Sequence, residues 1–213
     1  MSIDKKYKLY VFDFDGTLID TRTDIARTFQ VFLGEFGYPE PSLDEVRSAI
    51  GGGAKQAIAK LCDMSESDID KNLDRFLELY AQLCADNTTI YEGGEELVRR
   101  LKSEGALLAV ITMKAKIPTM NIIKKHKLES LFDDVISYDD VEKRKPDPQS
   151  MNLLLEKYGL SPGDALMIGD TVVDLRFAKA AGVDAVAMTY GYGKTDEVLA
   201  EKPQYLLDSF LDF

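Results

Sequence analysis

Residues 9–17 read Leu9-Tyr10-Val11-Phe12-Asp13-Phe14-Asp15-Gly16-Thr17, an apolar run followed by two acidic residues and a glycine. An unbroken apolar run is typical of a strand that is buried on both faces of a parallel sheet. Two carboxylates follow the run, and residues two apart on an extended backbone point to the same side. Gly16 then lets the chain turn away. In an open parallel sheet, a site that receives both carboxylates lies beyond the carboxyl ends of the strands.

Further apolar runs occur at 107–111, 135–137, 165–168 and 185–188, and helical patterns separate them. This alternation predicts an α/β fold with a doubly wound parallel sheet. Between the first two runs, residues 20–87 show helical periodicity alone, which is too long for one crossover connection. We therefore predict a core formed by 1–19 and 88–213 and an inserted α-helical domain formed by 20–87.

The composition is that of an ordinary globular protein: 213 residues, 45% hydrophobic, with a net charge of -11. That charge argues against a nucleic-acid groove or an anionic membrane surface as partner, because both require clustered basic residues. The chain starts without a hydrophobic signal core and has no apolar run of about 18 residues, which predicts a cytoplasmic localisation and no membrane span.

Cys62 and Cys84 form no metal or redox motif. Because His126 is the single histidine, histidine-based catalysis is not favoured.

Each later run leads to polar residues at or soon after its end. Thr112 follows 107–111, Lys145-Pro146-Asp147-Pro148 follows 135–137, and Gly169-Asp170-Thr171-Val172-Val173-Asp174 follows 165–168. The carboxylate pair by itself fits a calcium loop, a surface turn or a phosphoryl-transfer site. A calcium loop is excluded because Thr17 and Leu18 stand where an EF-hand needs Asp or Asn and then Gly.

Together these motifs resemble the haloacid dehalogenase superfamily, in its phosphatase branch of the phosphoglycolate phosphatase type with a small helical cap. The resemblance runs from about Leu9 to Gly193. It implies a Rossmann-like core with a cap domain, and Mg²⁺-dependent hydrolysis of a small phosphorylated metabolite through an aspartyl-phosphate. A monomer or a homodimer is expected. An inorganic pyrophosphatase stays open as an alternative, as do, less favoured, a phosphomutase of the β-phosphoglucomutase kind and a non-catalytic phosphate-binding domain.

The resemblance also implies residue roles. Asp13 would be the nucleophile, and Asp15 the general acid and base. Lys145 would neutralise phosphate charge and hold Asp13, and Thr112 would bind a phosphate oxygen. The metal ligands would be Asp13, the backbone carbonyl of Asp15, and Asp170, with Asp174 as an outer-shell ligand or an anchor for the lysine.

Substrate contacts are expected from Gly16, Thr17, Met113, Lys114, Gly52 and Gly53. Met113 departs from the family pattern, which often has Asn there, and Met cannot donate a hydrogen bond. Gly51-Gly52-Gly53 is either a flexible turn or a loop that reaches over the substrate. A second glycine stretch, Gly191-Tyr192-Gly193-Lys194-Thr195, resembles the tail of a P-loop, but Met188 stands where the leading glycine would be needed. We therefore predict no nucleotide site there.

Overall fold

The computed structural model describes residue 3 and residues 5–50 and 53–213. The chain divides into two compact units. The first comprises Met1–Ile19, Ile90–Lys116 and His126–Phe213, and the second comprises Asp20–Thr89 and Ile117–Lys125. At the points where the chain passes between these units, β2 (Ile19–Asp20) and β3 (Thr89–Ile90) pair in a two-stranded sheet.

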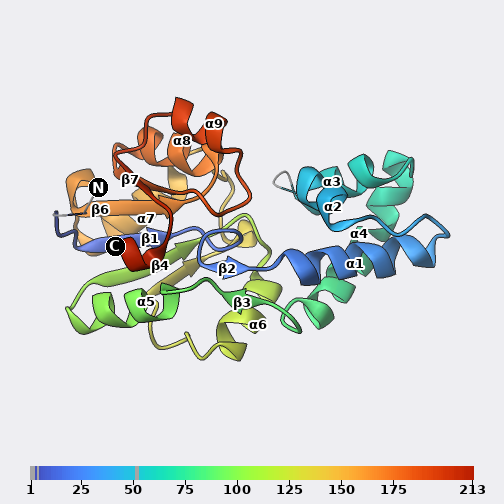
Figure 1. The fold of residues 1–213 in the computed structure, drawn as a ribbon, viewed down its shortest axis with the longest axis horizontal. Helices are drawn as coiled ribbons and strands as arrows, with labels where there is room; N and C mark the ends of the chain where they lie inside the picture. Colours follow the sequence, from blue (N-terminus) through green and yellow to red (C-terminus); the bar gives the residue numbers. More distant parts are fainter. Residues whose placement is uncertain (1–2, 4, 51–52) are drawn as a thin grey trace. The chain divides into compact units, whose positions relative to one another are not determined.

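A parallel sheet forms the centre of the first unit (Figure 1). In the described chain it has six strands in the order β5-β4-β1-β6-β7-β8, and every neighbouring pair is parallel. The predicted doubly wound α/β fold is therefore confirmed. The strands are β1 (Leu9–Phe12), β4 (Leu107–Ile111), β5 (Asp134–Ile136), β6 (Ala165–Gly169), β7 (Asp184–Met188) and β8 (Tyr205–Leu207).

Helices cover both faces of this sheet, and Figure 1 shows α8 and α5 on opposite sides of it. Leu9 and Val11 belong to the apolar cluster that includes residues of α7 and α8. Phe12 lies on the other face, with its ring centroid 6.1 Å from that of Phe132 and 6.3 Å from that of Phe210. Because β1 is buried on both faces, its sequence is an unbroken apolar run. The helices of this unit are α5 (Gly94–Ser103), α7 (Gln149–Tyr158), α8 (Val172–Ala181) and α9 (Thr195–Ala200), with 3-10 turns η1 (Tyr138–Asp140), η2 (Pro162–Asp164) and η3 (Phe210–Asp212).

The strand register places the ends of the central strands at one level. Phe12, the last residue of β1, pairs with Val110 of β4 and with Ile168 of β6. The next backbone amide, that of Asp13, donates to the Ile168 carbonyl at 2.8 Å. Residues that follow β1, β4 and β6 therefore emerge together at the carboxyl edge of the sheet.

The second unit is helical. Its helices are α1 (Arg22–Glu35), α2 (Leu43–Ala49), α3 (Ala54–Leu61), α4 (Glu66–Leu83) and, from Ile117 on, α6 (Lys116–Lys125). Three aromatic rings lie at its centre: that of Phe76 is 4.7 Å from Phe29 and 5.5 Å from Phe32, centroid to centroid. The sequence did not predict that α6 groups with this unit, where Asn121 donates a hydrogen bond to the Ala81 carbonyl at 3.1 Å.

A buried carboxylate ties the first turn of α1 to the segment just before β3. Asp24 is fully buried and accepts hydrogen bonds from the backbone amide and side chain of Asn87 and from the backbone amide and hydroxyl of Thr88. These bonds, between 2.8 and 2.9 Å long, replace the water that the carboxylate lost on burial. Asp24 therefore holds together the two ends of the residue 20–89 segment.

Among the described helices, none combines the length and apolar character that a membrane span requires.

Candidate active site

Loops from several strands bring a group of buried polar side chains to the carboxyl edge of the sheet. Asp13 follows β1, Thr112 and Lys114 follow β4, Lys145 follows β5, and Asp170 follows β6. All five are buried, as is Asp174 in the first turn of α8. Burying so many polar groups is unfavourable unless they are paired, so their partners decide what the site can do.

Lys145 bridges two carboxylates. Its Nζ atom donates to Asp13 Oδ1 at 2.5 Å and to Asp174 Oδ1 at 2.6 Å. Burial by itself would lower the pKa of Lys145, but the adjacent carboxylates of Asp13 and Asp174 outweigh it and raise that pKa. Lys145 is therefore a permanently charged ammonium group that fixes the position of the Asp13 carboxylate.

Around Lys145, the negative charge of the buried carboxylates is larger than the positive charge of the lysine. Burial, followed by repulsion from Asp174, raises the pKa of Asp13 well above its ordinary value, and Lys145 offsets this only in part. Burial and the charge of Asp174 likewise raise the pKa of Asp170 to about 6. Both shifts indicate a site that would be stabilised by more positive charge than Lys145 supplies.

A divalent cation fits this arrangement. Asp13, Asp170 and Asp174 each offer a carboxylate oxygen, and the three atoms lie within 4.8 Å of one another. An all-oxygen donor set suits a hard cation, and a charge of +2 would offset the excess negative charge. The predicted ligand role of the Asp15 carbonyl stays a prediction.

Asp174 has both carboxylate oxygens engaged by protein donors. Oδ1 accepts from Lys145, while Oδ2 accepts from the hydroxyl of Thr171 at 2.6 Å and from its backbone amide at 3.1 Å. Thr171 is the N-cap of α8 and forms a capping box with Asp174. This role of Thr171 was not predicted, although its spacing to Asp174 is that of a capping box. This geometry suits an anchor for Lys145, and direct metal contact by Asp174 stays a prediction.

Asp170 is enclosed by the loops after β1 and β7. Its Oδ1 accepts from the Thr17 hydroxyl at 2.6 Å, and its Oδ2 accepts from the Tyr192 backbone amide at 2.6 Å. A Cβ atom on Gly16 or Gly191 would lie 2.7 or 2.2 Å from Asp170 Oδ2, so both positions require glycine for close approach. Gly16 and Thr17 thus contact Asp170, and their substrate-binding role stays a prediction.

Residues 191–193 have a role that was not predicted from the sequence. The backbone amides of Tyr192 and Gly193 in the Gly-Tyr-Gly stretch donate to the Asp170 carboxylate. A Cβ atom on Gly193 would lie 2.1 Å from the Asp170 carbonyl oxygen. The available signal was a pair of glycines just after a strand end, which marks close approach of another group.

The residues after β4 contact the loop after β1. Lys114 Nζ lies 2.7 Å from Asp15 Oδ1, and Thr112 Oγ1 accepts from the Lys114 amide at 3.0 Å. Met113 between them is half-buried. The predicted substrate contacts of Met113 and Lys114 stay predictions.

Two predicted substrate residues belong to the helical unit. Gly53 is the N-cap of α3, with a φ of 90° that favours glycine. Gly52 lies outside the described residues. A substrate contact at either position stays a prediction.

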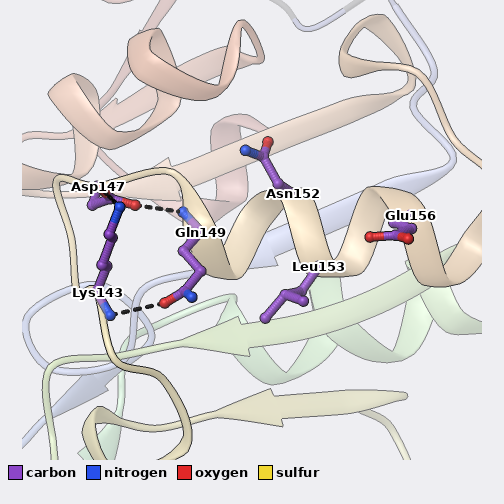
Figure 2. A pocket seen from close by; sticks show the side chains of 6 residues that line it. All are labelled: Lys143, Asp147, Gln149, Asn152, Leu153 and Glu156. Carbon is purple, nitrogen blue, oxygen red and sulfur yellow. Dashed lines mark hydrogen bonds and ion pairs between the residues drawn. The ribbon is translucent and has the colours of Figure 1, made fainter.

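A surface hollow beside α7 is distinct from this group of buried residues (Figure 2). The Lys143 amide donates to Gln149 Oε1 at 2.8 Å, and the Gln149 amide donates to Asp147 Oδ1 at 3.0 Å. These bonds fasten the loop that carries Lys145 to the start of α7. The residues that line the hollow are Lys143, Asp147, Gln149, Asn152, Leu153 and Glu156, so it does not contain the buried carboxylates.

A family model of haloacid dehalogenase-like hydrolases matches residues 10–188. A phosphoglycolate phosphatase from Aliivibrio fischeri is 34% identical, over 95% of this chain and 93% of that protein. One from Mannheimia succiniciproducens is 29% identical, over 99% and 98%. A crystal structure from Haemophilus somnus, described as a predicted phosphoglycolate phosphatase, superposes with a TM-score of 0.91 at 28% identity and covers 98% of this chain and 97% of that one. This chain is therefore an enzyme of the haloacid dehalogenase-like hydrolase family, and the resemblance to its phosphatase branch predicted from the strand-end motifs is confirmed.

Proposed function

We propose that this enzyme is a magnesium-dependent phosphatase that hydrolyses a small phosphomonoester of the phosphoglycolate type through an aspartyl-phosphate. One observation carries the proposal: the buried Lys145 donates to Asp13 and Asp174 at the strand ends. Together with Asp170, these two residues offer a cation three carboxylate oxygens. The names of the relatives in Aliivibrio fischeri and Mannheimia succiniciproducens support the substrate class.

Charge is the first requirement of the reaction. A phosphomonoester dianion and the Asp13 carboxylate repel each other, and phosphoryl transfer needs positive charge on the phosphate oxygens. Lys145, whose Nζ atom lies 2.5 Å from Asp13 Oδ1, supplies one such charge. Magnesium, held by the Asp13 and Asp170 side chains and the Asp15 carbonyl, would add charge that favours the ionised form of Asp13 and neutralises the phosphate.

In the first half-reaction, an Asp13 carboxylate oxygen attacks phosphorus, and the bond between phosphorus and the ester oxygen breaks. Asp15 gives its proton to the departing ester oxygen, so this oxygen leaves as a neutral hydroxyl group. The Thr112 hydroxyl and nearby backbone amides bind the phosphate oxygens. Asp13 then carries the phosphoryl group as an acyl phosphate.

In the second half-reaction, water attacks the same phosphorus atom while Asp15, now a carboxylate, accepts a proton from it. The bond between phosphorus and the Asp13 oxygen breaks, which restores the carboxylate and releases inorganic phosphate. Lys145 keeps Asp13 in place through both steps because Asp174 and Thr171 anchor it.

The helical segment 20–87 is proposed as the cap that selects among leaving groups, with Gly52 and Gly53 in its substrate loop. This part of the proposal rests on the family resemblance. The cytoplasmic localisation and a monomeric or homodimeric state stay predictions.

A phosphate-release screen tests the proposal. Wild-type enzyme is assayed with phosphoglycolate, pyrophosphate and sugar phosphates, with magnesium and then with excess chelator, and acid-quenched samples are examined for phosphorylated Asp13. Asp13→Asn should lower turnover by about a thousandfold or more, because an amide is a poor nucleophile. Asp147→Asn makes the same chemical change at a half-exposed carboxylate near Lys145 and should stay close to wild type.

Three outcomes would contradict the proposal. Full activity in excess chelator would remove the metal from the mechanism, and active Asp13→Asn enzyme would exclude Asp13 as the nucleophile. A clear preference for pyrophosphate over phosphoglycolate would instead identify an inorganic pyrophosphatase.

A further inference from the structure

Lys114 is a second buried lysine at the carboxyl edge of the sheet. Its side chain is 3% exposed, the same fraction as that of Lys145. Burying an ammonium group is strongly unfavourable unless a charged or hydrogen-bonding partner compensates for the lost water. The Asp15 carboxylate supplies such a partner, because its Oδ1 atom lies 2.7 Å from Lys114 Nζ.

The backbone of Lys114 is fixed from two sides. Its amide donates to the Thr112 hydroxyl at 3.0 Å, and its carbonyl accepts from the Tyr138 amide at 3.0 Å. Thr112 follows β4 and Tyr138 follows β5, so the ends of two neighbouring strands hold the base of this side chain. The Lys114 ammonium group is therefore presented to Asp15 from a rigid support.

Asp15 lies on the loop after β1, and its side chain is 22% exposed, compared with 10% for Asp13 and 1% for Asp174. A carboxylate that is partly open to solvent can adopt several rotamers unless a partner holds one of its oxygens. Lys114 holds Oδ1, as Lys145 holds Oδ1 of Asp13. The two carboxylates of the Asp13-Phe14-Asp15 segment are thus fixed by lysines from two different loops.

We infer that Lys114 is a positioning residue that orients the Asp15 side chain toward the leaving-group oxygen, and this inference rests on the proposed role of Asp15. A general acid acts only when it lies within hydrogen-bond reach of the atom that it protonates. Small displacements of a positioned group reduce the rate steeply. Lys114 therefore acts through Asp15, whereas Lys145 acts on Asp13.

The inference predicts a loss that depends on the leaving group. Phosphoglycolate releases a poor leaving group that needs protonation, whereas p-nitrophenyl phosphate releases a stable anion that does not. The ratio kcat/KM reports steps only up to the first irreversible one, departure of the leaving group, so the second half-reaction, common to both substrates, does not enter it. Lys114→Met should lower kcat/KM for phosphoglycolate by about 10- to 100-fold, part of the gain that a positioned acid gives. For p-nitrophenyl phosphate the loss should stay below about threefold.

The experiment measures kcat/KM for both substrates in wild type and in a set of variants. Asp15→Asn sets the reference pattern for loss of the acid, and Lys114→Arg tests whether another cation at this position restores activity. Lys116→Met is the matched control, because Lys116 is half-exposed and pairs with Asp140 instead. The double variant Lys114→Met/Asp15→Asn should be no slower than Asp15→Asn alone, since both changes remove the same contribution, that of a positioned general acid.

Each outcome decides between readings. Selective loss in Lys114→Met, with partial recovery in Lys114→Arg and no effect of Lys116→Met, supports the inference. Equal loss on both substrates, while Asp15→Asn stays selective, would overturn it in favour of phosphate binding by Lys114 and would leave the proposed function intact. A non-selective Asp15→Asn would overturn the proposed role of Asp15, and the inference with it. If Lys114→Met does not fold, Lys114→Gln, which keeps a hydrogen-bond donor, is judged by the same selectivity.

Discussion

Lowering the pH from 7 to 5 should stabilise the metal-free protein, and Asp170→Asn should remove a large part of that gain. Asp170 has a pKa raised from an ordinary 3.8 to about 6, because it is buried and lies near the charge of Asp174. For a carboxyl group whose pKa is higher in the folded state, folding is favoured by protonation. This contribution is fully present below pH 3.8 and is lost as the pH rises through about 6.

The size of the effect follows from that difference in pKa. A rise from 3.8 to about 6 corresponds to about 3 kcal/mol of stability over the whole titration. About 1 kcal/mol of this returns between pH 7 and pH 5, because only the upper part of the titration lies in that interval. For a chain of this length the melting temperature should rise by about 2–4 °C. Asp13, whose pKa is also raised by burial, acts in the same direction.

Thermal unfolding in excess chelator, followed from pH 5 to pH 7 by calorimetry, measures this slope for wild type and Asp170→Asn. All other titrating groups are common to the two proteins, so the difference between their slopes isolates Asp170 and its neighbours. Asp164→Asn is the matched control. Hydrogen bonds from Ser161 lower the pKa of Asp164, so its contribution is lost only as the pH falls below about 4.

Equal slopes for wild type and Asp170→Asn would refute the argument that burial of Asp170 opposes its ionisation. Added magnesium gives an independent check. Because the cation and the proton compete for the same carboxylates, stabilisation by magnesium should weaken as the pH falls through about 6. Stabilisation that is constant from pH 7 to pH 5 would place the cation elsewhere.

Two further predictions concern contacts that hold the site and the helical unit. Gly191→Ala places a Cβ atom 2.2 Å from Asp170 Oδ2 and should weaken magnesium affinity, measured by calorimetric titration, by about tenfold. The control Gly163→Ala, where a Cβ atom has no neighbour within 4 Å, should leave the affinity unchanged. Equal affinities of the two variants would show that the loop of Gly191 does not hold Asp170. Asp24→Ala leaves buried donors without their acceptor and should lower the free energy of unfolding of the helical unit, measured in urea, by about 3 kcal/mol. Glu35→Ala removes an exposed carboxylate and is the control. An unchanged midpoint of urea unfolding in Asp24→Ala would mean that water replaces the carboxylate.

The sequence determined the central strands and the edge of the sheet at which the chemistry lies. Runs 9–12 and 107–111 coincide with β1 and β4, because burial on both faces requires unbroken apolar sequence. Asp13, Thr112 and Asp170 were predicted to lie together because parallel strands end at a common edge. By contrast, β8 was missed: it is a three-residue strand at the edge of the sheet, partly exposed, and its sequence has no distinctive pattern.

Most partners of the site side chains became evident only in the tertiary structure, and the contact between Lys145 and Asp13 was implied by the family resemblance, not by the local sequence. Thr17 contacts Asp170 across 153 positions of sequence, and Lys145 contacts Asp13 across 132. Local sequence patterns carry no information about such pairs, because the pairs depend on the strand order that places β4 and β6 on either side of β1. The same order brings the loop after β7 against Asp170 and so gives residues 191–193 a role that their sequence did not reveal. Strand positions follow from burial along the chain, whereas contacts between loops follow from the order in which the sheet assembles those strands.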